Sequence, residues 1–354
     1  MPNTPLVSVA SLTRVAAEYN DVLRALPAFQ FNEVAQALAL NLLSVSGKHV
    51  QMNPRRKAGL LKPYVAGGDP AMQAEILKFY ESVLEPKLVY GAADDNITNY
   101  REKKVLSNKG EKVDLQAKKH PLEFYIIKSM IESFGEDVIF NMFHGERSEA
   151  GTTPATAFNG FYTIYDMLVT AGEIAEAKGN LHTTGAFTAP VDGDSVAYDK
   201  LVAFVRAGNP LLRRGEVNLM ASSDLIIKAR DAFRNKTKNF EYATTEMMIE
   251  RLRDDAQAPS LKLITHEALG TGNKLTLLKP GVLDFGMGDQ GDKEFVQVRT
   301  PYKDPNIVQF WMEAAFDTRV NDVHAKMFLT NEQTSEAVDL AGDYKDEPVP
   351  PVGE

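Results

Sequence analysis

The chain has 354 residues, of which 44% are hydrophobic and 25% charged, with a formal net charge of −9. This length fits about two domains with sizeable cores. The chain has no cysteine, which excludes disulfides, thiolate metal sites and cysteine nucleophiles. A net-negative surface is expected to repel nucleic acid. With no secretion-signal pattern and no long apolar window, the sequence predicts a soluble, non-secreted globular protein.

The N-terminal part reads mainly as helices. Apolar spacing predicts a helix over residues 11–26 and a second one after Asn32 that ends at Ser46. Residues 52–63 read as a basic, proline-punctuated linker. A third helix is expected from Asp69 to Glu85.

Residues 97–117 read as a basic hairpin, with a turn at 107–110. Between residues 101 and 119 the chain has seven Lys or Arg and three Asp or Glu, a local reversal of the overall charge. Two interpretations stay open: a solvated charged hairpin, or a projecting loop that needs an acidic partner surface. In the second case the candidate contact residues are Arg101, Lys103, Lys104, Lys109 and Lys112.

The most strongly patterned stretch runs from Pro121 to Phe143. Its apolar residues recur at spacings of three to five, which predicts an amphipathic helix. Proline suits the first helical position, because its missing N–H costs nothing there. The helix would be about 35 Å long. Gly135 is its weak point, since glycine costs roughly 1 kcal/mol relative to alanine inside a helix.

The region after this helix is mostly helical. Residues 144–161 form a loop by composition, and a helix is expected from there to about Gly172. Residues 195–253 read as helices, with Ser223 as a cap and one short strand over 216–222.

From Leu261 to Thr330 the pattern indicates strands, so the fold class is α+β. The string from Gly286 to Gly291 matches the dinucleotide fingerprint, but the next segment alternates like a strand, which favours a tight hairpin turn. Trp311 is expected in the core. The tail after Thr330 is acidic and is expected to be loose.

The motifs of common active sites are missing. The six histidines form no close pair at metal-ligand spacing, and there is no nucleophile elbow or P-loop spacing. The basic segments 55–57 and 101–119 lack the aromatic residues of a single-strand stacking groove. No catalytic, cofactor-binding or metal-binding residue is therefore assigned. The prediction is a structural or binding role and no enzyme activity.

The order of elements resembles the major capsid protein of tailed bacteriophages, which has the Hong Kong 97-type fold. The resemblance covers roughly residues 50–330. The stretch 158–174 looks like capsid proteins of phages that infect Bacteroidetes-type hosts. The segments that carry the resemblance are 97–117, 121–143, 143–168, 295–320 and 323–330.

The resemblance implies a division of the chain. The expected parts are an N-terminal arm (1–62), a helix and extended hairpin loop (63–120), a spine helix (121–144), an axial domain (145–293), returning strands of the peripheral domain (294–330) and an acidic tail (331–354). The loop, residues 87–119, would lie over an adjacent subunit.

The resemblance also implies partners and a location. The chain would assemble with itself into pentamers and hexamers of an icosahedral shell, without a cofactor or membrane. Scaffolding, portal and decoration proteins are further partners, and packaged double-stranded DNA is contacted only weakly and non-specifically. The virion would be assembled in the host bacterial cytoplasm. The alternatives are an encapsulin-like compartment shell, and an enzyme or ligand-binding protein without a recognisable motif.

Overall fold

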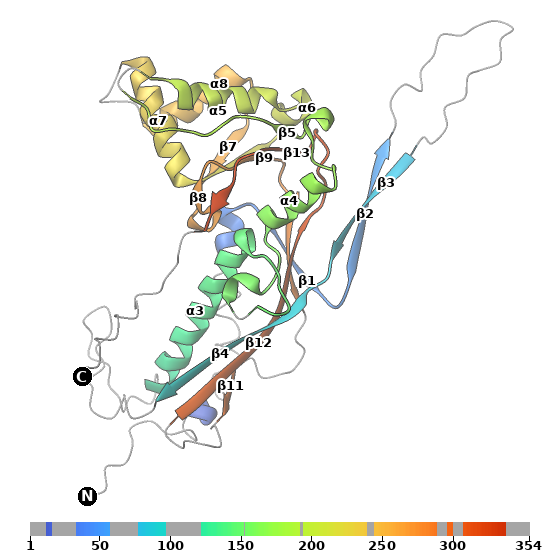
Figure 1. The fold of residues 1–354 in the computed structure, drawn as a ribbon, viewed down its shortest axis with the longest axis vertical. Coiled ribbons are helices and arrows are strands. Elements are labelled where there is room, and N and C mark those ends of the chain that lie inside the picture. The colour runs from blue at the N-terminus through green and yellow to red at the C-terminus, as the bar shows by residue number, and fades with distance from the viewer. Residues whose placement is uncertain are drawn as a thin grey trace, which may run out of the picture.

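The long helix and the strands that return beside it form one end of an elongated molecule, and a second α/β unit forms the other end (Figure 1). The buried apolar residues form two cores, one centred on the long helix and one within the second unit, and the first core also includes Met220, Leu278 and Phe328 of the second unit. The computed structural model describes residues 12–15, 33–56, 77–96, 122–151, 153–191, 194–238, 244–288, 296–299 and 307–337.

The predicted spine helix is confirmed as α3 (Leu122–His144). Its buried face includes Ile127, Ile131, Phe134 and Val138, spaced as one stripe of an amphipathic helix. Gly135 lies within the helix and weakens it. The free energy gained by burying this stripe against the neighbouring sheet is larger than that cost.

A five-stranded sheet packs against α3. Its centre is β12 (Ile307–Val320), which pairs antiparallel with β4 (Lys87–Asn96) on one side. On the other side β12 pairs with β10 (Leu283–Gly288) and β11 (Val296–Arg299), and β1 (Asn41–Val45) runs parallel to β10.

The two faces of the main sheet differ in burial, and strand β12 shows this difference. Its residues alternate between buried and half-buried along most of the strand. Phe316 on the covered face lies 6.3 Å from Phe134 of α3, centroid to centroid. Gly91 of β4 lets this helix approach, because a Cβ there would lie 2.7 Å from the Phe134 ring. On the opposite face the alternate residues of β12, Trp311 among them, are only half-buried.

The second unit is built on another five-stranded sheet, ordered β5-β13-β9-β6-β7. Its strands are β5 (Leu181–His182), β13 (Phe328–Asn331), β9 (Leu275–Leu278), β6 (Val217–Ala221) and β7 (Leu261–Ile264). A small two-stranded sheet joins β8 (Thr271–Gly272) to β14 (Ser335–Glu336).

Helices cover this second sheet. They are α5 (Val196–Ala207), α6 (Pro210–Arg213), α7 (Ser223–Thr237) and α8 (Thr245–Ala256). Helix α4 (Phe161–Thr170) belongs instead to the core around α3. Short 3-10 turns occupy Pro154–Thr156, Glu176–Lys178 and Glu267–Leu269. The helices predicted between residues 161 and 253, the strand near 216–222 and the α+β class are confirmed.

A two-stranded antiparallel ribbon leaves the body between the two units (Figure 1). It consists of β2 (His49–Arg56) and β3 (Leu77–Leu84), joined by eight registered residue pairs. We call β2 and β3 together the ribbon.

The ribbon corrects the expectations for the N-terminal part. Residues 77–84 form a strand where a helix was expected, and the supposed linker contributes residues 52–56 to β2. The helix after Asn32 covers only residues 33–37 before β1 begins. Apolar residues at 77, 79 and 83 alternate as well as they match a helical spacing, so pairing with β2 decides the outcome.

Other expectations were wrong in detail. Residues 87–96 form an edge strand of the main sheet and no part of a projecting loop. Strands β10 and β11 lie end to end along β12 and do not pair with each other, so the predicted hairpin at Gly286 is absent. The side chain that caps α7 is Ser222, which accepts from the Leu225 N–H, and the last expected strand begins only at Phe328.

Candidate subunit interface

The root of the ribbon is fixed by a buried charged network. Arg319 of β12 and Asp284 of β10 form an ion pair, and both side chains are at most 3% exposed. The Arg319 guanidinium also donates to Gln51 Oε1 at 3.0 Å and lies 2.9 Å from His49 Nδ1. Asn41 donates to the second carboxylate oxygen of Asp284 at 2.9 Å. Because buried charges are tolerated only when paired, this network fastens β2 to the sheet.

Further polar contacts follow at every second residue of β2. Asn53 donates to the backbone oxygen of Asn321 at 2.6 Å. Arg55 pairs with Asp322 at 3.0 Å, and its guanidinium lies 4.3 Å from the Tyr80 ring centroid. Burial raises the pKa of Tyr80. Since strand side chains alternate, one face of the ribbon holds these contacts, and we call it the inner face.

The junction between the ribbon and the main sheet is also fixed. Strand β3 ends at Leu84, whose buried side chain packs where a Cβ on Gly286 would lie. The next residue, Glu85, donates its backbone N–H to Asp317 Oδ2 at 2.7 Å. Burial raises the pKa of this aspartate. The chain then enters β4 at Lys87.

The opposite face of the ribbon is open and mainly apolar, and it also carries the exposed Glu81, which lies opposite Met52. We define this outer face by five side chains that belong to β2 and β3. Their exposed fractions are 39% for Val50, 61% for Met52, 46% for Leu77, 55% for Phe79 and 39% for Val83. Apolar side chains grouped on one open face are typical of protein–protein contact sites.

A second open apolar surface lies on the face of the main sheet opposite α3. Leu88 and Tyr90 of β4 are 72% and 65% exposed. The Tyr90 ring stacks on Trp311 of β12, so Trp311 is a half-buried surface residue, which corrects its expected place in the core. Arg299 comes from β11, the strand on the other side of β12, and its guanidinium lies over the Trp311 ring, 5.6 Å from the ring centroid. We call Leu88, Tyr90 and Trp311 the platform.

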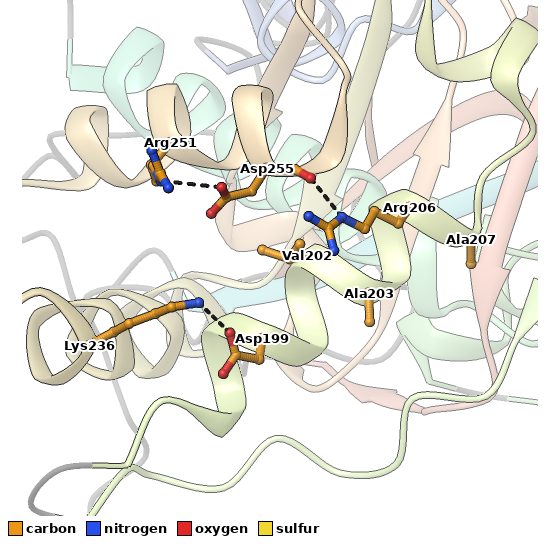
Figure 2. Close-up of a pocket in the computed structure, with 8 residues that line it drawn as sticks. All are labelled: Asp199, Val202, Ala203, Arg206, Ala207, Lys236, Arg251 and Asp255. Atoms are coloured by element: carbon orange, nitrogen blue, oxygen red, sulfur yellow. Dashed lines mark hydrogen bonds and ion pairs between the residues drawn. The ribbon is translucent and has the colours of Figure 1, made fainter.

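An open hollow of about 570 Å³ lies among α5, α7 and α8 (Figure 2). Its charged residues already have partners. Asp199 pairs with Lys236 at 2.6 Å, and Asp255 pairs with Arg251 at 3.2 Å and accepts from the Tyr198 hydroxyl. The lining residues are Asp199, Val202, Ala203, Arg206, Ala207, Lys236, Arg251 and Asp255. These contacts hold the three helices together, and both carboxylates in the hollow already have partners in them.

Three further expectations from the sequence concern the basic hairpin, metal binding and membrane-spanning helices. The basic hairpin 97–117, with Arg101, Lys103, Lys104, Lys109 and Lys112, lies outside the described residues. Within the described ranges no group of three His, Asp or Glu side chains could hold a metal ion. No helix in these ranges has the length and apolar character needed to cross a membrane. Sequence reasoning missed the ribbon and the platform, although apolar residues at the alternate positions 77, 79 and 83 were a usable signal for a strand.

Known proteins resemble this chain in structure and not in sequence. No family model matches it, and no curated protein sequence does. A chain of the satellite phage P4 procapsid, solved with its size determination (Sid) protein, matches with a TM-score of 0.52 at 14% identity, over 86% of this chain and 90% of that one.

Two further matches have lower scores. The capsid of the native GTA particle matches at TM-score 0.46 and 11% identity, over 84% of this chain and 89% of that one. Mycobacterium phage Adephagia matches at TM-score 0.47 and 10% identity, over 85% and 89%. The P4 match spans both units and shows that the chain has the Hong Kong 97-like fold of phage capsid proteins.

Proposed function

We propose that this chain is the major subunit of an icosahedral shell of a tailed phage, which encloses double-stranded DNA. The observation that carries the proposal is the P4 procapsid match, because it extends over most of both chains. The open faces of the ribbon and sheet support it, since a subunit of a closed assembly must present complementary surfaces.

In this proposal the two units have different places in the shell. The spine helix α3, helix α4 and the main sheet form the peripheral domain, and the second sheet with its covering helices α5 to α8 forms the axial domain around the capsomer axes. The subunit is structural and not an enzyme, and its main partner is itself, in pentamers and hexamers. Scaffolding, portal and decoration proteins remain proposed partners, as does the place of assembly in the host bacterial cytoplasm.

The contents of the assembled particle test this function. The chain is expressed with its neighbouring genes, and large particles are collected by sedimentation and treated with nuclease. Protected double-stranded DNA is the expected result. Particles that hold a protein cargo and no DNA would favour a compartment shell over a capsid. A small ligand-binding monomer under all conditions would overturn both shell functions.

A further inference from the structure

Two turns of the chain are closed by histidine side chains. At the start of the 3-10 turn Glu267–Leu269, the Ala268 N–H donates to Nδ1 of His266 at 3.0 Å. Between β12 and β13, the Lys326 N–H donates to Nδ1 of His324 at 3.1 Å. A ring nitrogen accepts a hydrogen bond only while it carries no proton, so each turn is closed only by a neutral histidine. We call these two segments the histidine turns.

Both histidine turns lie where the two units meet. The first follows β7 of the second sheet, yet its Ala268 and Leu269, which are 2% and 1% exposed, are buried in the core around α3. The second joins β12 of the main sheet to β13 of the second sheet, and Val323 beside it is buried in the same core. The turns therefore hold apolar residues that fasten one unit to the other.

The second histidine turn is fixed by further polar contacts. The Asn180 side chain donates to the backbone oxygen of Val323 at 2.6 Å. The Asp322 carboxylate accepts from the backbone N–H of His324 at 2.9 Å and pairs with Arg55 of the ribbon at 3.0 Å. The direction in which the chain enters β13 therefore depends on this turn.

A third histidine, His144 at the end of α3, faces the first histidine turn. A Cβ on Gly270 would lie 2.6 Å from its Nε2, and its ring meets the Tyr162 ring edge to face, with centroids 5.2 Å apart. Its Nε2 is buried and has no hydrogen-bond partner among the described residues. Burial lowers the pKa of this ring, and the backbone of Leu269 and Ala268 opposes the shift only in part. A charge here would be costly, because the site is desolvated.

Burial also lowers the pKa values of His266 and His324. The folded chain therefore binds protons less readily than the unfolded one, whose histidines titrate near pH 6.5. The closed turns contribute fully above about pH 6.5, and this contribution is lost as pH falls through the lower folded values. The charged groups that act on the two rings are Glu267 on His266, which opposes the shift, and on His324 Asp322, which opposes it, with Arg55 and Lys326, which add to it.

We propose that the two histidine turns form an acid-sensitive joint between the two units. At neutral pH both turns are closed and the units keep one relative orientation. When His266 and His324 take up protons, each Nδ1 becomes a donor, the backbone N–H groups lose their acceptors and the turns open. The units then move relative to each other while each keeps its own sheet. This property belongs to the single subunit and goes beyond the proposed shell function.

Distances between two spin labels on one chain test the joint directly, because the chain has no native cysteine. Ser129→Cys on α3 and Met247→Cys on α8 place one label at an exposed position of each unit. Labelled chain is diluted with unlabelled chain, so that only distances within a subunit are read. Between about pH 7.5 and about pH 5 the distance between the labels should shift, and it should return on neutralisation.

A second pair of labels separates movement at the joint from unfolding. Leu211→Cys on α6 and Met247→Cys on α8 both lie in the second unit, so their distance should stay unchanged over the same pH range. An unchanged distance between the units at about pH 5 would overturn the proposal. A shift of equal size within the second unit would overturn it as well. Neither result affects the shell function, which the contents of the particle test.

Asparagine variants test whether the histidines cause the movement. An asparagine side chain can accept from the backbone N–H two residues on, and it does not titrate. His266→Asn/His324→Asn should therefore keep the distance seen at neutral pH and lose most of the acid shift. His182→Asn, which changes a half-buried histidine of β5, is the matched control and should shift like the wild type.

The outcome that contradicts the role of the histidines is an acid shift in the double variant as large as that of the wild type. If the double variant does not fold, the two single variants replace it, and each should show a smaller acid shift than the wild type. Single variants that both shift like the wild type would contradict the proposal in the same way.

Discussion

The ring of Tyr90 lies parallel to the indole of Trp311, with centroids 4.7 Å apart and planes 2° apart. The pair joins the neighbouring strands β4 and β12 of the main sheet on the face opposite α3. Aromatic pairs of this kind contribute about 0.5–1.5 kcal/mol beyond the burial of their area. An ordered aromatic surface is therefore present before any partner binds.

Trp311 is the only tryptophan in the chain, so its fluorescence reports on the platform alone. Assembly should shift its emission to shorter wavelength and reduce quenching by acrylamide, because a covered indole loses contact with water. The comparison is between unassembled subunits and particles in the same buffer. Unchanged emission and quenching in complete particles would show that the platform stays open.

The buried ion pair at the ribbon root should be costly to break from one side. Arg319→Leu leaves Asp284 buried without its cation, and the expected loss of stability is about 3–5 kcal/mol. Removing the second charge as well, in Arg319→Leu/Asp284→Asn, should restore part of this loss. Denaturant unfolding of the two variants measures the difference. A double variant less stable than the single one would contradict this account of the pair.

The basic residues of the hairpin 97–117 remain candidates for a contact. Changing Lys103, Lys104, Lys109 and Lys112 together to Glu should impair assembly more than it impairs folding of the subunit. The same four positions changed to Gln remove the charge without reversing it and should have a smaller effect. Light scattering during assembly and thermal unfolding of the subunit give the two readouts. Normal assembly of the Glu variant at low salt would show that the hairpin's charge has no role in the contacts between subunits.

Acid should weaken the fold through His144 at the end of the spine helix. Burial lowers its pKa below the ordinary 6.5, so the folded chain takes up a proton less readily than the unfolded one. The stability contributed by the neutral ring is complete above about pH 6.5 and is lost as pH falls from there through the folded pKa. Burial also lowers the pKa values of His266 and His324, which act in the same direction.

The change His144→Gln separates this residue from the others. Its unfolding temperature should fall less between pH 7.5 and about pH 5 than that of the wild type, because one titrating ring is gone. His182→Gln is the control, because His182 is half-buried in the second α/β unit and not at the end of α3. Equal pH slopes for the wild type and His144→Gln would contradict the assignment.

Sequence patterns predicted the elements whose local signal agrees with their packing. Helix α3 was found because one side of it is buried, which gives a helical repeat of apolar residues. Strand β12 was found because its faces alternate between the α3 side and the open side. The order of these elements was enough to predict the Hong Kong 97-like fold that the P4 match shows.

The ribbon and its anchoring could not be found in the same way. Residues 77–84 fit both a helix and a strand, and only pairing with β2 distinguishes the two. Arg319 lies 270 residues from His49 and 35 from Asp284, and no local pattern links them. Trp311 was placed in the core because large aromatic residues usually are buried, whereas here it belongs to an open face.

Electron microscopy of the protein, expressed alone and purified without denaturant, tests the central claim most directly. The account predicts closed shells, tubes or rings of five or six subunits, because copies of a shell subunit assemble with closed symmetry. A uniform population of small globular particles, persisting when the neighbouring genes are co-expressed, would contradict assembly into a shell.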